Sequence, residues 1–267
     1  MSEGEPAQPG RVRGLWADHL AADKAPNPAR RLEVCVDDPA GLDAALRGGA
    51  DRIELCSALA LGGLTPSLGF MQMAGALALP VYAMIRPRAG DFYFSPAEAD
   101  LMEREIAAAR EAGLAGVVLG AGLPDGRLDI RLLERLLRAA DGLGTTLHRA
   151  FDLAGPDFDA ALDHAIGLGF ERVLTSGGAR TAPDGLPVLA RLMERAEGRI
   201  TVMPGSGITA ATLPGLIASL PITEVHASCS KPLPVRSPAA ERLGFASPTE
   251  RRTDEGAVRA LKALLAG

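Results

Sequence analysis

The sequence predicts a single α/β domain, a (β/α)8 barrel, and three observations support this prediction. From Leu32 onward the chain repeats one unit, a short apolar strand followed by a turn and an amphipathic helix. Eight such units follow one another without an intervening second domain. The 267-residue length suits one barrel of this kind, which typically needs about 250 residues. An open doubly wound sheet also alternates strands and helices, but eight regular units favour closure.

The N-terminal segment does not share this repeat. Residues 1–30 are rich in alanine, proline, glycine and charged residues, which predicts a flexible N-terminal extension before a barrel domain over residues 31–267. Within the extension, Trp16 and Leu20 would share one apolar face of a short docking helix. A disordered tail is the alternative.

The units of the repeat are assigned in chain order from their apolar runs and from the turn residues that bound them. The expected strands cover residues 32–36, 52–57, 81–86, 116–120, 145–150, 172–176, 199–203 and 224–229. The expected helices cover residues 39–47, 66–77, 95–113, 129–140, 156–168, 184–196, 209–220 and 254–265. Ser95 and Glu98 have the spacing of a capping box at the start of the third helix. A proline-rich stretch over residues 231–247 precedes the last helix.

Alternation along the strands predicts which side chains fill the barrel interior. Outward residues pack under the helices and must be apolar, so the alternate residues point inward. The inward set is unusually polar for a barrel, whose interior is normally filled by Val, Ile and Leu. It comprises Glu33, Cys35, Glu54, Cys56, Tyr82, Met84, Arg86, Thr146, His148, Leu174, Ser176, Thr201, Met203, His226 and Ser228.

The first two strands place carboxylates and thiols on one inward surface. Glu33 and Cys35 alternate with apolar residues on the first strand, and Glu54 and Cys56 do so on the second. Neighbouring strands lie about 4.8 Å apart, so these groups share one region. Burying a charge without a partner is costly. We therefore expect the two carboxylates to contact Arg86, a histidine or water.

Charged and imidazole side chains gather at the carboxyl ends of the strands, where barrel enzymes place their active sites. Arginine recognises carboxylate or phosphate, and histidine transfers protons or binds a metal. An ion-pair network that only holds the barrel together is the alternative, and a functional pocket is the favoured interpretation. The candidate catalytic residues are Glu33, Glu54, Arg86, His148 and His226.

Two glycine turns follow the sixth and seventh strands. Each leads to a helix N-terminus, where exposed backbone N–H groups suit an anion or phosphate. Glycine turns also occur for steric reasons alone, which is the alternative. Together with one arginine, the candidate anion-binding residues are Arg88, Ser176, Gly177, Gly178, Gly205, Ser206 and Gly207.

Two further segments lie at the ends of strands. The aromatic loop Phe92–Phe94 follows the arginines of the third strand and predicts either a lid or an oligomer contact, of which we favour the contact. After the fifth strand, Asp152 is spaced to orient the side chain of Arg149.

Composition argues against several classes of protein. The net charge is −5 and there is no long basic run, so a nucleic-acid partner is not expected. No apolar run approaches the roughly 18 residues of a membrane span, and the N-terminus lacks a signal-peptide core. Three cysteines cannot all pair, and they are not spaced as a disulfide framework. We therefore predict a soluble cytoplasmic protein with reduced thiols and no membrane partner.

Several segments together resemble the CutC family of copper homeostasis proteins, from about residue 32 to residue 231. The segments are Leu-Glu-Val-Cys at 32–35, Arg-Ile-Glu-Leu-Cys-Ser at 52–57, Gly-Gly-Leu-Thr-Pro-Ser at 62–67, Met-Ile-Arg-Pro-Arg at 84–88, Gly-Asp-Phe at 90–92, His-Arg-Ala-Phe-Asp at 148–152, Leu-Thr-Ser-Gly-Gly at 174–178 and Met-Pro-Gly-Ser-Gly-Ile at 203–208. Their combination is specific to the family.

The resemblance implies a (β/α)8 barrel, a cytoplasmic setting, self-association as a homodimer and a connection with copper handling or Cu(I) binding. The two family cysteines proposed for copper correspond to Cys35 and Cys56. Soft thiolates suit Cu(I), whereas the ordinary role of a free cysteine is that of a small core residue.

Two hypotheses for the function follow. The first is a copper-binding homeostasis protein in which Cys35 and Cys56 bind Cu(I) and a histidine or methionine completes the site. The second is an enzyme that acts on a small anionic or phosphorylated substrate at the carboxyl end of the barrel. In the second, the glutamates and histidines are the acid–base groups, and Arg86 with the glycine turns binds the anion.

Overall fold

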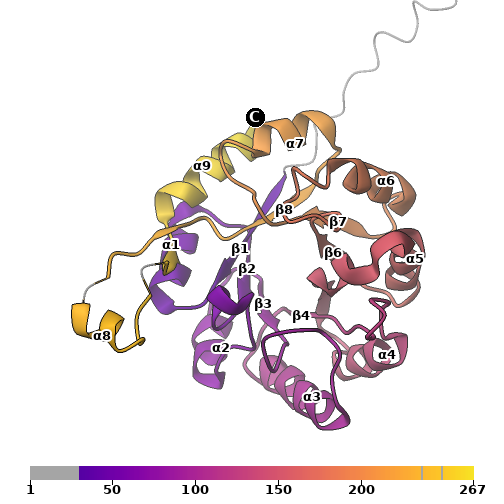
Figure 1. Cartoon of the computed structure of the whole chain (residues 1–267), viewed down its shortest axis with the longest axis horizontal. Coiled ribbons are helices and arrows are strands. Elements are labelled where there is room, and N and C mark those ends of the chain that lie inside the picture. Colours follow the sequence, from indigo (N-terminus) through magenta and orange to yellow (C-terminus); the bar gives the residue numbers. More distant parts are fainter. Residues whose placement is uncertain (1–29, 236, 248) are drawn as a thin grey trace, which may run out of the picture.

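Eight parallel strands form the centre of the protein, and helices surround them (Figure 1). The computed structural model describes residues 30–235, 237–247 and 249–267. The strands are β1 (Arg31–Val36), β2 (Arg52–Leu55), β3 (Val81–Met84), β4 (Gly116–Leu119), β5 (Gly144–Leu147), β6 (Arg172–Thr175), β7 (Thr201–Pro204) and β8 (Glu224–Ala227). They are ordered β7-β6-β5-β4-β3-β2-β1-β8, and β7 also lies beside β8. The predicted (β/α)8 barrel is confirmed.

The helices follow the strands in alternation. They are α1 (Pro39–Gly48), α2 (Leu68–Gly75), α3 (Pro96–Glu111), α4 (Ile130–Ala139), α5 (Phe158–Gly167), α6 (Leu186–Ala196), α7 (Leu213–Ser219) and α9 (Glu255–Ala266), with 3-10 turns η1 (Leu59–Leu61) and η2 (Arg149–Asp157). The predicted capping box at the start of α3 is present: the Ser95 side chain accepts from Glu98 N–H and the Glu98 side chain accepts from Ser95 N–H. Between strands and helices lies the main core, to which β1 contributes the fully buried Leu32, Val34 and Val36.

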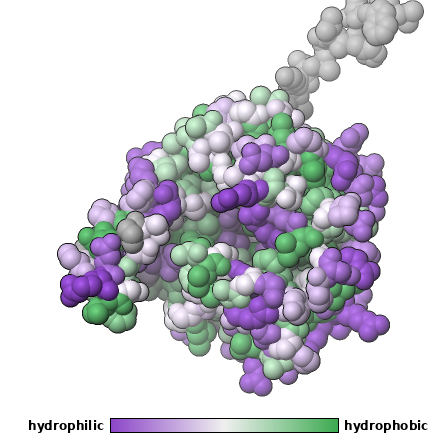
Figure 2. All heavy atoms as spheres, in the orientation of Figure 1, coloured by the Kyte–Doolittle hydropathy of each residue, from purple (hydrophilic) through white to green (hydrophobic). Residues whose placement is uncertain are grey.

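The proline-rich stretch before the last helix has structure of its own. Antiparallel strands β9 (Ser230–Pro232) and β10 (Arg251–Thr253) pair, and the short helix α8 (Pro238–Arg242) lies between them in the chain. This segment projects from the barrel, and Figure 2 shows hydrophobic residues on it. Leu243 and Phe245 are 64% and 82% exposed. The sequence predicted only a connection here, because the strand runs are too short to show a period of two.

The N-terminal extension, with Trp16 and Leu20, lies outside the described residues. Within the described ranges, the helices fall short of the length and apolar character that crossing a membrane requires.

Ion pairs and one aromatic ring fill the barrel interior near the amino ends of the strands. Arg52 donates to Glu33 and, at 2.6 Å, to Glu224, and its guanidinium lies 5.5 Å from the centre of the Tyr82 ring. The Tyr82 ring fits because Gly144 has no side chain; a Cβ at that glycine would lie 2.0 Å from the tyrosine oxygen. The predicted polar interior is therefore present, with each buried carboxylate of this layer paired to a cation.

Candidate functional site

A cavity of about 360 Å³ opens at the carboxyl ends of the strands. Its size lies at the lower end of the roughly 300–1,000 Å³ typical of small-molecule sites. The lining residues come from the ends of most strands: Cys35, Glu54, Leu59, Gly62, Met84, Arg86, Phe92, His148, Arg149, Leu174, Ser206, Gly207, Ile208, His226, Ala227 and Ser228. This is the end of the barrel where the sequence predicted a functional pocket.

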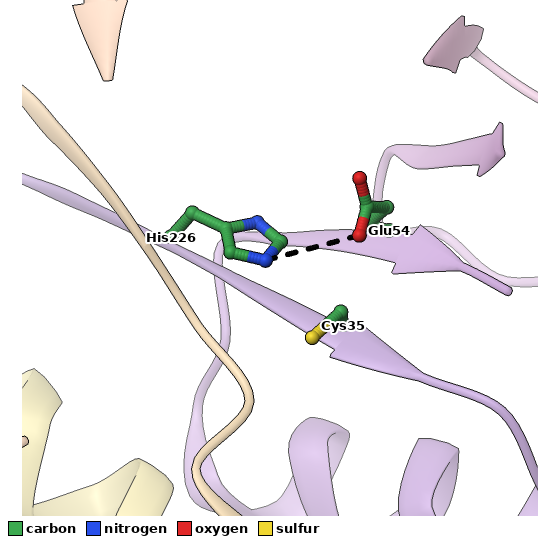
Figure 3. A group of neighbouring side chains, drawn as sticks. All are labelled: Cys35, Glu54 and His226. Atoms are coloured by element: carbon green, nitrogen blue, oxygen red, sulfur yellow. Dashed lines mark ion pairs between the residues drawn. The ribbon is translucent and has the colours of Figure 1, made fainter. Parts of the chain in front are cut away.

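Cys35, Glu54 and His226 form a compact group in the wall of this cavity (Figure 3). The register brings them together, because Cys35 pairs with Glu54 across β1 and β2, while Glu33 pairs with His226 across β1 and β8. One donor atom from each of the three residues lies within 4.8 Å of the other two. The Nε2 atom of His226 lies 3.8 Å from a carboxylate oxygen of Glu54. The three side chains therefore converge on one point.

The carboxylate of Glu33 contacts the imidazole of His226 and orients it. Its Oε1 lies 2.8 Å from His226 Nδ1, and its other oxygen accepts from Arg52. Burial alone would raise the pKa of Glu33, but the charge of Arg52 and the contact with His226 outweigh it and lower this pKa to about 2. Glu33 is therefore a permanent carboxylate that orients His226 with its Nε2 toward Glu54.

Burial or neighbouring charges raise the pKa of each of the three groups that converge here. Burial raises the pKa of the Cys35 thiol and of the Glu54 carboxyl. Burial would lower the pKa of His226, but Glu54 and Cys35 beside the ring raise it well above its ordinary value. At neutral pH the cluster consequently contains an imidazolium ion and a neutral thiol.

Cys56 lies next to this cluster but is not part of the three-residue group. Its thiol donates to Glu54 across 3.5 Å, and its side chain is completely buried. Burial and the Glu54 carboxylate raise the pKa of this thiol well above the ordinary value. The expected pair of Cys35 and Cys56 on adjacent strands is present, but Glu54, rather than Cys56, is the residue that faces Cys35 across the ladder.

Arg86 lies in the cavity wall, and in the described ranges no carboxylate lies at ion-pair distance from it. Its terminal nitrogens donate to the carbonyls of Leu61, Gly63 and Gly90 at 2.7–3.2 Å. Its guanidinium stacks 4.7 Å from the centre of the Phe92 ring. We expected Arg86 to contact Glu33 or Glu54, but Glu33 is paired with Arg52 instead. Burial lowers the pKa of Arg86, and the charge of Arg88 adds to this effect.

His148 is a neutral imidazole in the cavity wall. Its Nδ1 accepts from Ala150 N–H at 3.1 Å, so the ring proton resides on Nε2. Burial, and then the charge of Arg86, lower the pKa of His148 to about 3. The ring fits beside β4 because Gly120 has no Cβ, which would lie 2.4 Å from His148 Nδ1. Phe92 packs against this ring, with the centroids 4.8 Å apart.

Three of the lining side chains each have a buried polar atom without a hydrogen-bond partner in the described parts of the chain. These atoms are Glu54 Oε1, Arg86 Nε and His148 Nε2. Folded proteins leave few such atoms, because each unmet group costs about 1–3 kcal/mol. Their concentration around one cavity indicates a ligand-binding site.

The two glycine turns differ in their relation to the cavity. Ser206 and Gly207, after β7, line it. Gly205 lies behind them, where a Cβ would come within 2.4 Å of Leu174. After β6, the Ser176 hydroxyl is engaged by Arg149 at 2.6 Å and by a backbone carbonyl.

The N–H groups of the β6 turn already have partners within the chain. Gly177 N–H donates to Thr175 Oγ1 at 2.9 Å, and Gly178 N–H donates to the Asp152 carboxylate at 3.0 Å. Asp152 also accepts from Arg149 at 2.7 Å, as its spacing predicted. This turn thus holds a carboxylate of the protein itself where an external anion was expected.

Arg88 and Phe92 lie elsewhere than the sequence predicted, and Arg149 lines the cavity although it was not among the predicted site residues. Arg88 stays outside the cavity, where it pairs with Asp91 and Glu98. The Phe92 side chain turns toward the cavity rather than outward as a contact surface. Arg149 lines the cavity and was expected only as a partner of Asp152; its position directly after His148 was the available signal.

The comparisons with known proteins agree on one family. The family model described as "CutC family" matches residues 30–231. The family protein CutC of Rhizobium meliloti (strain 1021) is 60% identical over 234 residues, which cover 88% of this chain and 95% of the relative. The family protein CutC of Caulobacter vibrioides (strain NA1000 / CB15N) is 50% identical over 238 residues, covering 88% and 97%.

Solved structures show the same fold. The putative copper homeostasis protein CutC from Streptococcus agalactiae superposes with a TM-score of 0.71 at 30% identity, over 74% of this chain and 98% of that one. An aldolase, QR15, superposes with a TM-score of 0.57 at 13% identity, over 76% and 92% of the chains. The second similarity shows the barrel fold alone.

Proposed function

The chain belongs to the CutC family, and from this premise we propose that it is a copper-binding protein that holds the ion at the mouth of its barrel. The observation that carries the proposal is the convergence of Cys35, Glu54 and His226, whose donor atoms lie within 4.8 Å of one another. The Streptococcus agalactiae relative is described as a putative copper homeostasis protein, which agrees with this role.

The donor set fits a copper ion. The thiolate of Cys35 and the imidazole of His226 are ligands that copper prefers, whereas the Glu54 carboxylate is a harder ligand. Glu33 on the far nitrogen of His226 is the outer carboxylate that metal-bound histidines commonly have. Cys56, beside Glu54, supplies the second sulfur that Cu(I) favours. We therefore assign Cu(I) to Cys35 and His226, with Cys56 as the additional thiol.

A competition titration with a Cu(I) chelator under reducing conditions tests this assignment. We expect Cys35→Ser to weaken Cu(I) binding more than tenfold, and Glu33→Gln, which alters the outer contact to His226 and the ion pair with Arg52, to weaken it about 10–100-fold. Cys229→Ser is the matched control, since within the described residues this third buried cysteine makes no hydrogen bond to the three-residue group, whereas the Cys56 thiol donates to Glu54. Equal Cu(I) affinity in the wild type, Cys35→Ser and Cys56→Ser would refute the copper proposal.

A second function is favoured by a different observation. The partnerless buried atoms of Glu54, Arg86 and His148 surround a cavity much larger than one metal ion needs. Such an arrangement is typical of an enzyme that binds a small anionic substrate and moves protons on it. Glu54 and His226 are then the acid–base groups, and Arg86 binds the anion. This candidate survives if the cysteine variants bind Cu(I) as well as the wild type does.

We further propose that the protein acts in the reducing cytoplasm and forms a homodimer. Its three cysteines are free, as the cytoplasm would keep them. The exposed Leu243 and Phe245 on the projecting segment provide an apolar surface of the kind that self-association covers. Light scattering at micromolar concentration should give the mass of two chains, and a monomer mass would refute the homodimer.

A further inference from the structure

Arg86 is a buried cation without an acidic partner within the described ranges. Its side chain is among the buried charged residues, with 5% exposure, and its hydrogen bonds all end on carbonyl oxygens. The other arginine of the cavity, Arg149, is neutralised by Asp152. The imidazole of His226 contacts the carboxyl groups of Glu33 and Glu54. Among the described residues, Arg86 therefore differs from the other cations of the cavity in lacking a carboxylate at ion-pair distance, and an anionic ligand in the cavity would supply one.

Arg86 and His148 together present two hydrogen-bond donors. The free donor of Arg86 is Nε–H, because its terminal nitrogens are engaged by carbonyls. The free donor of His148 is Nε2–H, because Nδ1 accepts from the backbone. Phe92 contacts both side chains, and all three residues line the same cavity. Two N–H donors in one cavity suit the two oxygens of a carboxylate.

The acid–base groups lie on other strands around the same cavity. His148 follows β5, four strands from Cys35 on β1 in the closed ring of eight. Arg86, in contrast, follows β3, the neighbour of β2 that carries Glu54. A molecule held by its carboxylate at Arg86 and His148 would share the cavity with Glu54 and His226, which also line it. Leu59, Met84 and Leu174 line the same cavity and suit a short apolar body.

We infer that the cavity binds a small monocarboxylate, with its carboxylate on Arg86 and His148 and a carbonyl or hydroxyl group directed toward Glu54 and His226. A single negative charge matches the single guanidinium of Arg86. A phosphate monoester carries about −1.5 to −2 at neutral pH, and the surplus negative charge would share the cavity with the carboxyl group of Glu54. This inference rests on the second function proposed above and names its substrate class.

Calorimetric titration of the full-length protein with pyruvate tests the inference, because pyruvate combines one carboxylate with one carbonyl. We expect saturable binding that Arg86→Gln weakens about tenfold or more, since a charge-assisted hydrogen bond is lost. His148→Gln should weaken it less, since its donor is uncharged. Arg88→Gln is the matched control, because that arginine belongs to the same loop but pairs with Asp91 and Glu98 outside the cavity. It should bind pyruvate as the wild type does.

Two further probes separate the possible failures. Pyruvamide, which has the shape of pyruvate without its charge, should not bind detectably. If inorganic phosphate binds and pyruvate does not, the inference of a monocarboxylate substrate is wrong, but the proposal of an enzyme that binds an anion is retained. If neither binds, both the class and the enzyme proposal fail. If Arg86→Gln and His148→Gln, shown folded by circular dichroism, both bind pyruvate unchanged, the assigned subsite is wrong.

Discussion

Replacing Arg52 by methionine is expected to lower the free energy of unfolding by about 3–5 kcal/mol, because a buried ion pair is broken from one side. Arg52 lies in the centre of the barrel interior, with its side chain 5% exposed. It donates to Glu33 and, at 2.6 Å, to Glu224, so the substitution leaves two buried carboxylates short of a cation. Urea denaturation followed by circular dichroism measures the loss.

A surface arginine provides the matched control for this experiment. Arg47 also pairs with two acidic residues, Asp43 and Glu255, but its side chain is 56% exposed. Arg47→Met should therefore cost about 0–1 kcal/mol. Combining Arg52→Met with Glu33→Gln should recover part of the loss, because one stranded charge is removed. If Arg52→Met costs no more than Arg47→Met, the buried network does not hold the barrel together.

The interior layer illustrates which contacts the sequence reveals. The period-two pattern correctly predicted that Glu33 and Glu54 point inward, because the outward positions must be apolar under the helices. It did not identify Arg52 as the partner of Glu33. That contact depends on the stagger between β1 and β2, which pairs Glu33 with Arg52 and Cys35 with Glu54. A stagger is a property of the closed barrel and is not encoded in either strand alone.

The same limit applies to the candidate site. The pattern placed Cys35, Glu54 and His226 in the barrel interior and put His226 at the carboxyl end of its strand, but only the register shows that the three converge while Cys56 lies outside the group. The glycine turns show a second limit. Glycine after β6 indicates exposed N–H groups, yet Asp152 from the preceding unit fills that position at 3.0 Å. A contact between residues so far apart in sequence cannot be found from local spacing.

Cu(I) binding is expected to strengthen as the pH rises, by up to about 1,000-fold for each pH unit, because the ion must displace the protons of three ligands. The pKa values of Cys35, Cys56 and His226 are all raised, those of the two thiols first by burial and that of His226 by Glu54 and Cys35 against the effect of burial. Each of these groups that holds a proton in the free protein must lose it to bind the metal. Affinity consequently rises with pH. Falling pH has the opposite effect, since protons then compete with the ion.

A variant isolates the proton of His226. His226→Gln removes the imidazolium, so the change in affinity with pH should become about tenfold smaller per unit, leaving the part carried by the thiols of Cys35 and Cys56. The titrations use one Cu(I) chelator whose own pH dependence is measured in parallel, and the wild type and the variant are compared at each pH. Identical pH dependence in the two proteins would show that His226 does not lose a proton to the metal. Copper would then be held by the thiols without the imidazole, and His226 would be left to act on an organic substrate.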